Sequence, residues 1–291
     1  MTSELNQVER DFIEFMSQKT NRPIARTEEL FRQTRRRFQF AGDDYSRLAG
    51  DIAHLFRMLC DTDTEEGMID CYRMHALPNL FKYISYTYPK PRQSYLRDLI
   101  RDAKKGEWRN AWNFLRRKFA RPKATKGLHL GPTGIAHVLM DSIQGDPVVV
   151  DYGSGPAYIS YEIARANSRA AIFLVDVDSL VLEFALFRLR KTGAAVHAIP
   201  VTKTNLYPQL PEHNICIASE VMEHLAHPLR ACDNIIRALR PDGILYGRFD
   251  DHQPNMYHVS PDLAELRRQI ARSFQQIGQA CYRKKSEVDN G

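Results

Sequence analysis

The sequence predicts an α/β fold in which a doubly wound, mostly parallel sheet follows a helical N-terminal domain. A glycine-rich loop, Asp151 to Ala157, comes directly after the β-branched run 148–150, as expected where a buried strand ends. About 20 residues further on, the apolar run 171–175 ends in Asp176, which is the distance at which an acid after a second strand binds ribose hydroxyls. These two features predict a site for a nucleoside-containing cofactor.

The third observation is the alternation of strands and helices over about 100 residues, which is typical of a sheet with right-handed crossovers. Such sheets bind ligands beyond the carboxyl ends of their strands, beside the first strand. The segment 274–285 is expected to be one long strand or a hairpin around Gly278. The other expected strands are 147–150, 171–175, 195–201, 214–219 and 243–249, and the expected helices are 135–143, 159–166, 180–191, 229–239 and 261–273.

The N-terminal part of the chain differs from the rest in charge. Residues 1–130 hold 25 Lys and Arg against 17 Asp and Glu, a balance of +8, whereas the remainder holds 16 against 18, a balance of −2, and the sum is the net charge of +6. Apolar residues recur at helical spacing in 9–15 and 45–60. We therefore expect a helical substrate or lid domain over 1–130 and a cofactor-binding domain over 131–291.

Much of this positive charge lies in the segment 92–126, which has 12 basic and 3 acidic residues. Such a segment is often a solvated helix face whose long side chains cover apolar surface. It would also suit a lid or groove that attracts a phosphate-bearing substrate or a nucleic acid. Because no RNA-binding motif accompanies the charge, the first interpretation is favoured.

Composition restricts the class of protein. Hydrophobic residues make up 43% and charged residues 26% of the 291 residues, as is usual for globular proteins. No apolar run approaches the roughly 18 residues that span a bilayer, and the polar start is not typical of a signal peptide. The five cysteines form no C-x-x-C pair. We expect a cytoplasmic protein with reduced thiols and no membrane partner.

Four segments in the right order resemble class I S-adenosylmethionine-dependent methyltransferases. These segments are the loop DYGSGPA, the acid in FLVDVD, ICIASEVMEHLAHP, and NIIRALRPDGILYGRF. The resemblance covers roughly residue 130 to the C-terminus and implies a Rossmann-like domain with S-adenosyl-L-methionine as cofactor. The Asn-Pro-Pro-Tyr motif of enzymes that methylate adenine or glutamine and the Pro-Cys nucleophile of cytosine C5 enzymes are both absent from the sequence.

The resemblance also assigns cofactor-binding residues. Asp176 would accept both ribose hydroxyls, Val177 would pack on the adenine, and Asn205 would offer its side-chain oxygen to the adenine amine. The third glycine of the family loop is Ala157 here. The methionine part of the cofactor would be lined by Asp151, Gly153, Ser154 and Gly155, with Ser219 and Glu220 contributing from the end of the fourth strand.

Candidate catalytic residues follow the fourth and fifth strands, and the resemblance implies that the residues after the fourth strand face the methyl group. Glu220 and His224 come from the segment Glu220-Val221-Met222-Glu223-His224. His252 and His258 follow the fifth strand, and an unperturbed histidine titrates near neutral pH. A general base is needed only when the nucleophile carries a proton at that pH. These four residues are the predicted catalytic set.

A metal site is the competing interpretation of the same residues. On a helix, Glu220, Glu223 and His224 would share one face, and His258 would complete a ligand set for a divalent cation. This pattern is similar to the metal-binding segment of small-RNA terminal 2′-O-methyltransferases. Many metal-free small-molecule methyltransferases carry the same E-x-x-E-H segment, with its acids placed to favour a helix N-terminus. We favour the metal-free interpretation.

The sequence therefore predicts methyl transfer to a small metabolite, which the basic N-terminal part would suit if the metabolite is anionic. A small-molecule substrate is favoured over a nucleic acid. The alternative is a metal-dependent RNA 2′-O-methyltransferase. A third hypothesis is a non-catalytic binding protein with this fold. The presence of both Asp151 and Asp176 argues against it, because such a protein would not need to recognise the ribose of a cofactor.

Overall fold

The computed structural model describes residues 5–41, 64, 66–73, 131–251, 258–260 and 262–286. The predicted helical segment 45–60, the basic segment 92–126 and the candidate base His252 lie outside these residues.

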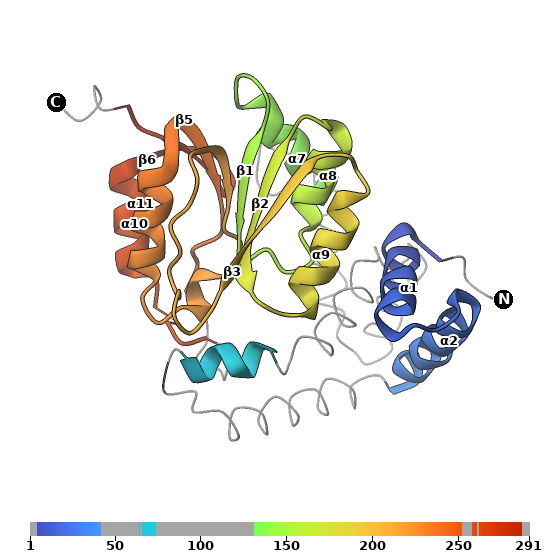
Figure 1. The fold of residues 1–291 in the computed structure, drawn as a ribbon. Coiled ribbons are helices and arrows are strands. Elements are labelled where there is room, and N and C mark those ends of the chain that lie inside the picture. The colour runs from blue at the N-terminus through green and yellow to red at the C-terminus, as the bar shows by residue number, and fades with distance from the viewer. Residues whose placement is uncertain are drawn as a thin grey trace, which may run out of the picture.

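A seven-stranded sheet in the order β3-β2-β1-β4-β5-β7-β6 forms the centre of the fold (Figure 1). β3, β2, β1, β4 and β5 are parallel, and β7 pairs antiparallel with both β5 and β6. The predicted doubly wound, mostly parallel sheet is thus confirmed. The strands are β1 (Val148–Tyr152), β2 (Ala171–Val177), β3 (Ala195–Val201), β4 (His213–Ile217), β5 (Leu239–Tyr246), β6 (Phe274–Gly278) and β7 (Cys281–Lys284).

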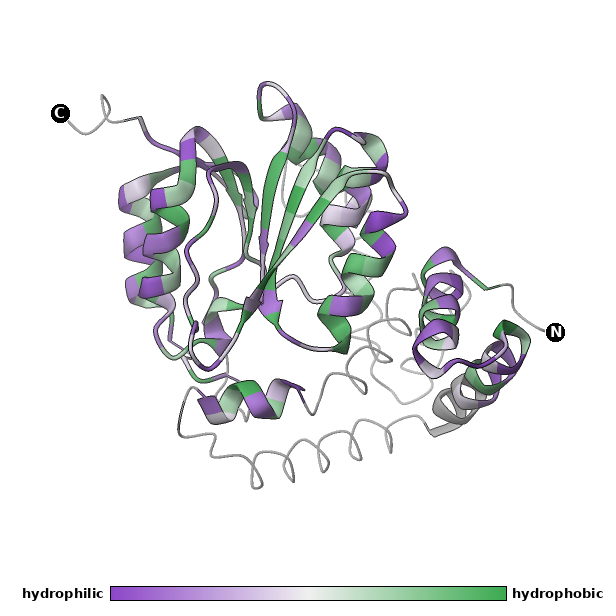
Figure 2. Cartoon of the chain, in the orientation of Figure 1, coloured by the Kyte–Doolittle hydropathy of each residue, from purple (hydrophilic) through white to green (hydrophobic). Residues whose placement is uncertain are grey.

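Helices cover both faces of the sheet. α7 (Pro132–Asp141), α8 (Tyr158–Ala166) and α9 (Leu180–Arg190) pack on one face, and α10 (Pro228–Ala238) and α11 (Ala264–Ser273) pack on the other. The central strands β1 and β4 are almost completely buried and mainly apolar, whereas β3, at one edge of the sheet, is more exposed. The helices are polar where they face solvent (Figure 2). This packing explains why continuous apolar runs predicted the strands.

The ends of several elements differ from the prediction. β3 matches it, whereas β1 and β2 each extend two residues beyond the predicted end. The predicted turn before the fifth strand is wrong, because β5 begins at Leu239 and pairs with β4 through a register shift between His213 and Ile215. Gly278 lies at the end of β6, and the segment 274–285 is the predicted hairpin rather than one strand.

Two N-terminal helices precede the sheet: α1 (Gln7–Thr20) lies beside α9, and α2 (Ile24–Ala41) packs on α1 (Figure 1). A capping box starts α1: the amide of Glu9 donates to the Asn6 side chain and the amide of Asn6 donates to the Glu9 carboxylate. The buried face of these helices packs on α9 through a cluster of Phe12, Ile13, Phe15, Phe31, Val181 and Phe184.

A further helical segment, 66–73, lies across the edge of the sheet where the parallel strands end (cyan in Figure 1). The four described cysteines are buried free thiols. Among the described residues, no helix is long and apolar enough to cross a membrane.

Candidate active site at the carboxyl edge of the sheet

The loop between β1 and α8 forms one wall of the site. Gly153 and Gly155 adopt positive φ angles of 68° and 48°, a backbone region that glycine enters without steric cost. The amide of Gly153 donates to the carbonyl of Val175 at 2.7 Å, which ties the loop to β2. A Cβ atom at position 153 would lie 2.3 Å from Cγ2 of Val221. Position 153 therefore has no room for a side chain.

Asp176, near the end of β2, faces the same loop. Its Oδ2 accepts the amide of Gly155 at 2.6 Å, and its Oδ1 accepts the amide of Val177 at 2.7 Å. Burial raises the pKa of Asp176, while these amides and the Ser154 hydroxyl act in the opposite direction. The carboxylate is thus fixed at the edge of the sheet where ligands of such folds bind.

A first pocket lies between the glycine loop, the end of β2 and the residues after β4. It encloses about 910 Å³, its open mouth included. Ser179 and Val181, from the start of α9, complete the wall beside Asp176. This pocket brings together six residues that the sequence singled out: Gly153, Gly155, Asp176, Val177, Glu220 and His224.

Asp151 lies behind the loop and is absent from the pocket lining among the described residues. It is 4% exposed, and its Oδ2 accepts the hydroxyl of Ser160 at 2.6 Å. Burial raises the pKa of Asp151 from 3.8 to about 7; the Ser160 hydroxyl lowers it and the charge of Asp176 raises it. In the structure, Asp151 thus connects the end of β1 to Ser160 on α8, behind the loop. The resemblance implied direct contact between Asp151 and the cofactor instead.

Three other predicted cofactor residues also lie outside the lining that the structure describes. Ser154 is buried, and its hydroxyl lies 3.5 Å from Oδ2 of Asp176. Ser219 is the residue before Glu220, which does line the pocket. Asn205 is exposed, and its backbone N–H donates to the carbonyl of Thr202 at 3.0 Å. The apolar Leu206 lines the pocket instead, so the residue beside the predicted one occupies the wall.

A second pocket of about 580 Å³, open mouth included, continues from the first. It is lined by Thr64, Met68 and Ile69 from the N-terminal part of the chain, and by Ala226 and Val259 from the segments after β4 and β5. The two pockets have six lining residues in common: Tyr72, Val177, Val201, Leu206, His224 and Leu225. The site is therefore one cleft with two compartments.

The predicted helix over Glu220 to His224 is wrong in its length. Only Met222–His224 is helical, as the short 3₁₀ helix η1, and Glu220 precedes it with a φ of 55°. Glu220 is exposed whereas Glu223 is 1% exposed, so the two carboxylates do not share a helix face. The expectation of one common face fails because the chain turns between them.

His258 nevertheless joins the last two residues of this segment. Ligand atoms of Glu223, His224 and His258 all lie within 4.8 Å of one another. The imidazole rings of His224 and His258 are 5.2 Å apart between centroids, and Nε2 of His224 is 3.8 Å from Oε1 of Glu223. The predicted four-residue metal set is thereby reduced to three among the described residues, since Glu220 lies outside the cluster.

Tyr72 is the main site residue that the sequence did not reveal. Its ring lies edge-on to His224 at 5.9 Å between centroids, and it lines both compartments. No motif surrounds it in the sequence. An aromatic residue on a short helix is usually explained by packing alone, so only its position in the fold identifies it.

The fold and this cleft define an α/β domain with its cleft at the carboxyl edge of a parallel sheet, where such folds bind their ligands. Residues 143–287 match the family model described as a methyltransferase domain. The domain over residues 143–287 therefore belongs to the methyltransferase family that this model describes.

Solved structures of methyltransferases are similar over part of the chain. A provisionally assigned O-methyltransferase from Nostoc punctiforme is 23% identical, with a TM-score of 0.35 over 42% of this chain and 37% of its own. An rRNA methylase from Streptococcus thermophilus is 18% identical, with a TM-score of 0.39 over 55% of this chain and 100% of its own. The plantazolicin methyltransferase BpumL, solved with SAH, is 13% identical, with a TM-score of 0.37 over 48% of this chain and 61% of its own. No curated protein sequence matches this chain.

Proposed function

We propose that this protein transfers a methyl group from S-adenosylmethionine to a small molecule. The observation that carries this proposal is the two-compartment cleft. The glycine loop and Asp176 lie in one compartment, an apolar cavity forms the other, and His224 lines both. A cofactor and an acceptor bound in adjoining compartments would have their reacting atoms held close together, which is how positioning lowers the barrier of such a reaction.

The residues of the first compartment fit the cofactor. Gly153 and Gly155 have no side chains, so a ligand can approach the backbone of the loop closely, and the fixed carboxylate of Asp176 suits two ribose hydroxyls. Val177 offers an apolar surface for the adenine ring. S-adenosylmethionine, when bound, supplies an electrophilic methyl group: the bond from sulfur to this carbon breaks as the bond to the acceptor forms, and S-adenosylhomocysteine remains.

In this proposal, His224 takes a proton from the acceptor. It is partly buried, with 25% of its side chain exposed, and lies where the two compartments meet. Imidazole is basic at neutral pH and can accept the proton of a hydroxyl or an amine as its oxygen or nitrogen attacks the methyl carbon. The carboxylate of Glu223, 3.8 Å from Nε2 of His224, would stabilise the resulting positive charge.

The lining of the second compartment favours a neutral acceptor over an anionic one. Apart from Thr64, two tyrosines and His224, its described lining residues are apolar, and none of them is Lys or Arg. An acceptor carboxylate or phosphate would lose hydration there without gaining a positive partner, which is costly. The nearby Lys203 forms an ion pair with Asp70 outside this lining.

A second candidate, metal-assisted methylation of an RNA 2′-hydroxyl, is favoured by the Glu223, His224 and His258 cluster. One carboxylate and two imidazoles are ligands that suit several divalent transition metals. A cation held by these three residues would lie beside the second compartment, because His224 is part of its wall.

Titration calorimetry with S-adenosylhomocysteine tests the proposal. We expect the metal-stripped protein to bind it, and Asp176→Ala to weaken binding about 100-fold, because two hydrogen bonds to a charged acceptor are lost. Asp178→Ala is the matched control, since this acid is 62% exposed and does not line either pocket. Equal affinity of wild type and Asp176→Ala would refute the assignment of the cofactor site.

The same titration separates the two candidates. Repeating it with Mn²⁺ and a short RNA should change nothing if the acceptor is a small molecule. Binding of RNA that depends on Mn²⁺ and is lost in His258→Ala would establish the second candidate instead. His224→Ala should lower turnover far more than cofactor affinity; normal values of both would make His224 a structural residue.

A further inference from the structure

Arg188, on α9, is a fully buried cation directly behind the glycine loop. Its guanidinium lies 4.0 Å from the ring centroid of Tyr161 on α8, and its Nη1 donates to the carbonyl of Pro156 at 3.4 Å. Pro156 stands between Gly155, whose amide donates to Asp176, and Ala157, whose amide donates to Ser154 at 2.8 Å. Arg188 therefore holds the backbone of the loop that forms the proposed cofactor site.

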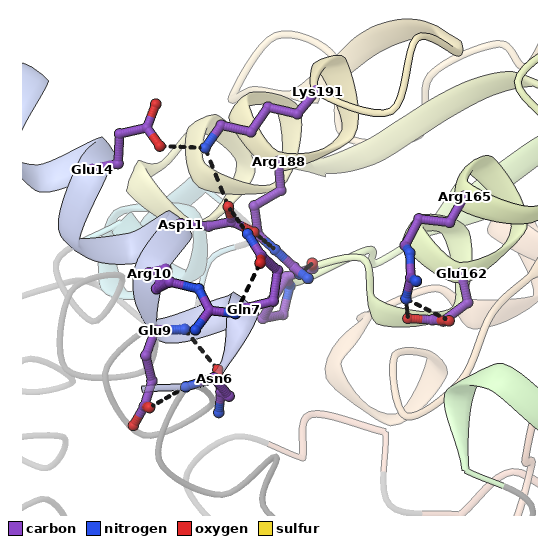
Figure 3. Close-up of polar contacts among 11 residues, drawn as sticks. Asn6, Gln7, Glu9, Arg10, Asp11, Glu14, Glu162, Arg165, Arg188 and Lys191 are labelled. Carbon is purple, nitrogen blue, oxygen red and sulfur yellow. Dashed lines mark hydrogen bonds and ion pairs between the residues drawn. The ribbon is translucent and has the colours of Figure 1, made fainter. Parts of the chain in front are cut away.

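The negative charge that balances Arg188 comes from the N-terminal helix. Arg188 Nε donates to Oδ2 of Asp11 at 3.3 Å, and Asp11 is 1% exposed (Figure 3). The other oxygen of Asp11 accepts from Lys191 at 3.2 Å and from the Gln7 side chain at 3.0 Å. Asp11 and Arg188 are 177 residues apart in the sequence. The support of the loop thus depends on a helix from a different part of the chain.

The N-terminal helices contact the same pocket at a second point. Phe12 and Phe15 pack against Phe184, with ring centroids 5.8 and 5.5 Å apart, in a cluster that includes Val181. Val181 is also a lining residue of the first pocket. Docking of α1 therefore fixes the start of α9 as well as the guanidinium of Arg188.

We propose that Asp11 is a positioning residue for the cofactor loop, and that docking of α1 and cofactor binding are energetically coupled. Without the Asp11 carboxylate, Arg188 is a buried cation that has lost its ion-pair partner, a costly state. The guanidinium then moves toward water and releases the carbonyl of Pro156. Coupling of this kind is reciprocal, so a bound cofactor stabilises the docked α1. Only the identity of the ligand rests on the function proposed above.

The test uses the full-length protein and the nearly isosteric variant Asp11→Asn. We expect its affinity for S-adenosylhomocysteine to fall about 10-fold, within the usual range of such couplings. Amide hydrogen exchange of Gly153, Ser154, Gly155 and Ala157, measured without ligand, should become faster. Glu14→Gln is the matched control, because Glu14 is on the same helix and binds Lys191 at 2.6 Å without contacting Arg188.

Arg188→Lys provides a second variant if Asp11→Asn folds poorly. It keeps a positive charge for Asp11 but cannot also reach the Pro156 carbonyl, so the loop should exchange faster while α1 stays protected. Normal ligand affinity and normal loop exchange in Asp11→Asn, whatever its melting temperature, would overturn the proposal, as would an equal effect of Glu14→Gln. If the wild type binds no S-adenosylhomocysteine, the proposed function fails, and the exchange of the ligand-free loop still decides the coupling.

Discussion

Burial of Asp151 makes the stability of this protein depend on pH. Its carboxyl pKa rises from 3.8 to about 7 on folding, chiefly through desolvation. The folded state therefore holds a proton that the unfolded state has released, and stability is lost as pH rises from about 4 to about 7. Three pKa units at 1.36 kcal/mol each correspond to a total loss of about 4 kcal/mol.

The substitution Asp151→Asn removes this effect, because an amide cannot ionise and its oxygen can still accept the Ser160 hydroxyl. Between pH 5 and pH 7.5, we expect the unfolding free energy of the variant to rise by about 2.5 kcal/mol relative to wild type. The measurement is urea unfolding followed by circular dichroism at half-unit steps of pH. Taking the difference between the two proteins cancels other titrations, such as that of His213, whose pKa burial lowers to about 4.

Asp141→Asn is the control for this experiment, since Asp141 is exposed at the end of α7. Its stability should differ from wild type by an amount that does not change over the same pH range. A pH-independent difference between wild type and Asp151→Asn would refute the reasoning, because it would mean that Asp151 is ionised throughout in the folded protein.

Three other predictions concern the pocket walls and the core. Gly153→Ala places a methyl group 2.3 Å from Val221 Cγ2 in a backbone with a φ of 68°, so urea titration should show a loss of about 2 to 4 kcal/mol, and an unchanged midpoint would contradict the close approach. Tyr72→Ala should weaken S-adenosylhomocysteine binding about 5-fold through lost ring contact, whereas Tyr72→Phe should bind nearly as wild type does; equal loss in both would be inconsistent with a packing role. Burial raises the pKa of Cys216 well above its usual range and that of Cys232 to about 12, so neither should react with a thiol reagent at pH 8 until the protein unfolds, and rapid reaction in the native state would disprove this.

The sequence predicted the sheet well because the signals for it are local. Apolar runs located β1 to β4 to within a few residues, and β1 and β4 are apolar because they are buried on both faces. The loop at Gly153 and the acid at Asp176 were found by their spacing, because a strand–loop–helix unit fixes that distance along the chain. The start of β5 was predicted at residue 243 because Pro241 and Asp242 are typical turn residues. In the structure they belong to β5, at the point where its pairing with β4 shifts in register.

Only the tertiary structure shows which residues from distant parts of the sequence meet in the site. His258 meets Glu223 and His224 only because the segment after β5 returns to the end of β4, where the amide of Ser260 donates to the carbonyl of Glu223 at 3.0 Å. Tyr72 reaches the cleft from the N-terminal part of the chain. No spacing rule connects these segments.

The sequence by itself thus determined the parallel sheet, its glycine loop and the acid beside it, because each depends on hydrophobic periodicity and short-range geometry. Only the tertiary structure decided that Asp151 bonds to Ser160 behind the loop and that Asp11 neutralises Arg188. The physical reason is that a charged side chain enters the interior only where packing supplies its partner. That partner can lie at any distance along the chain.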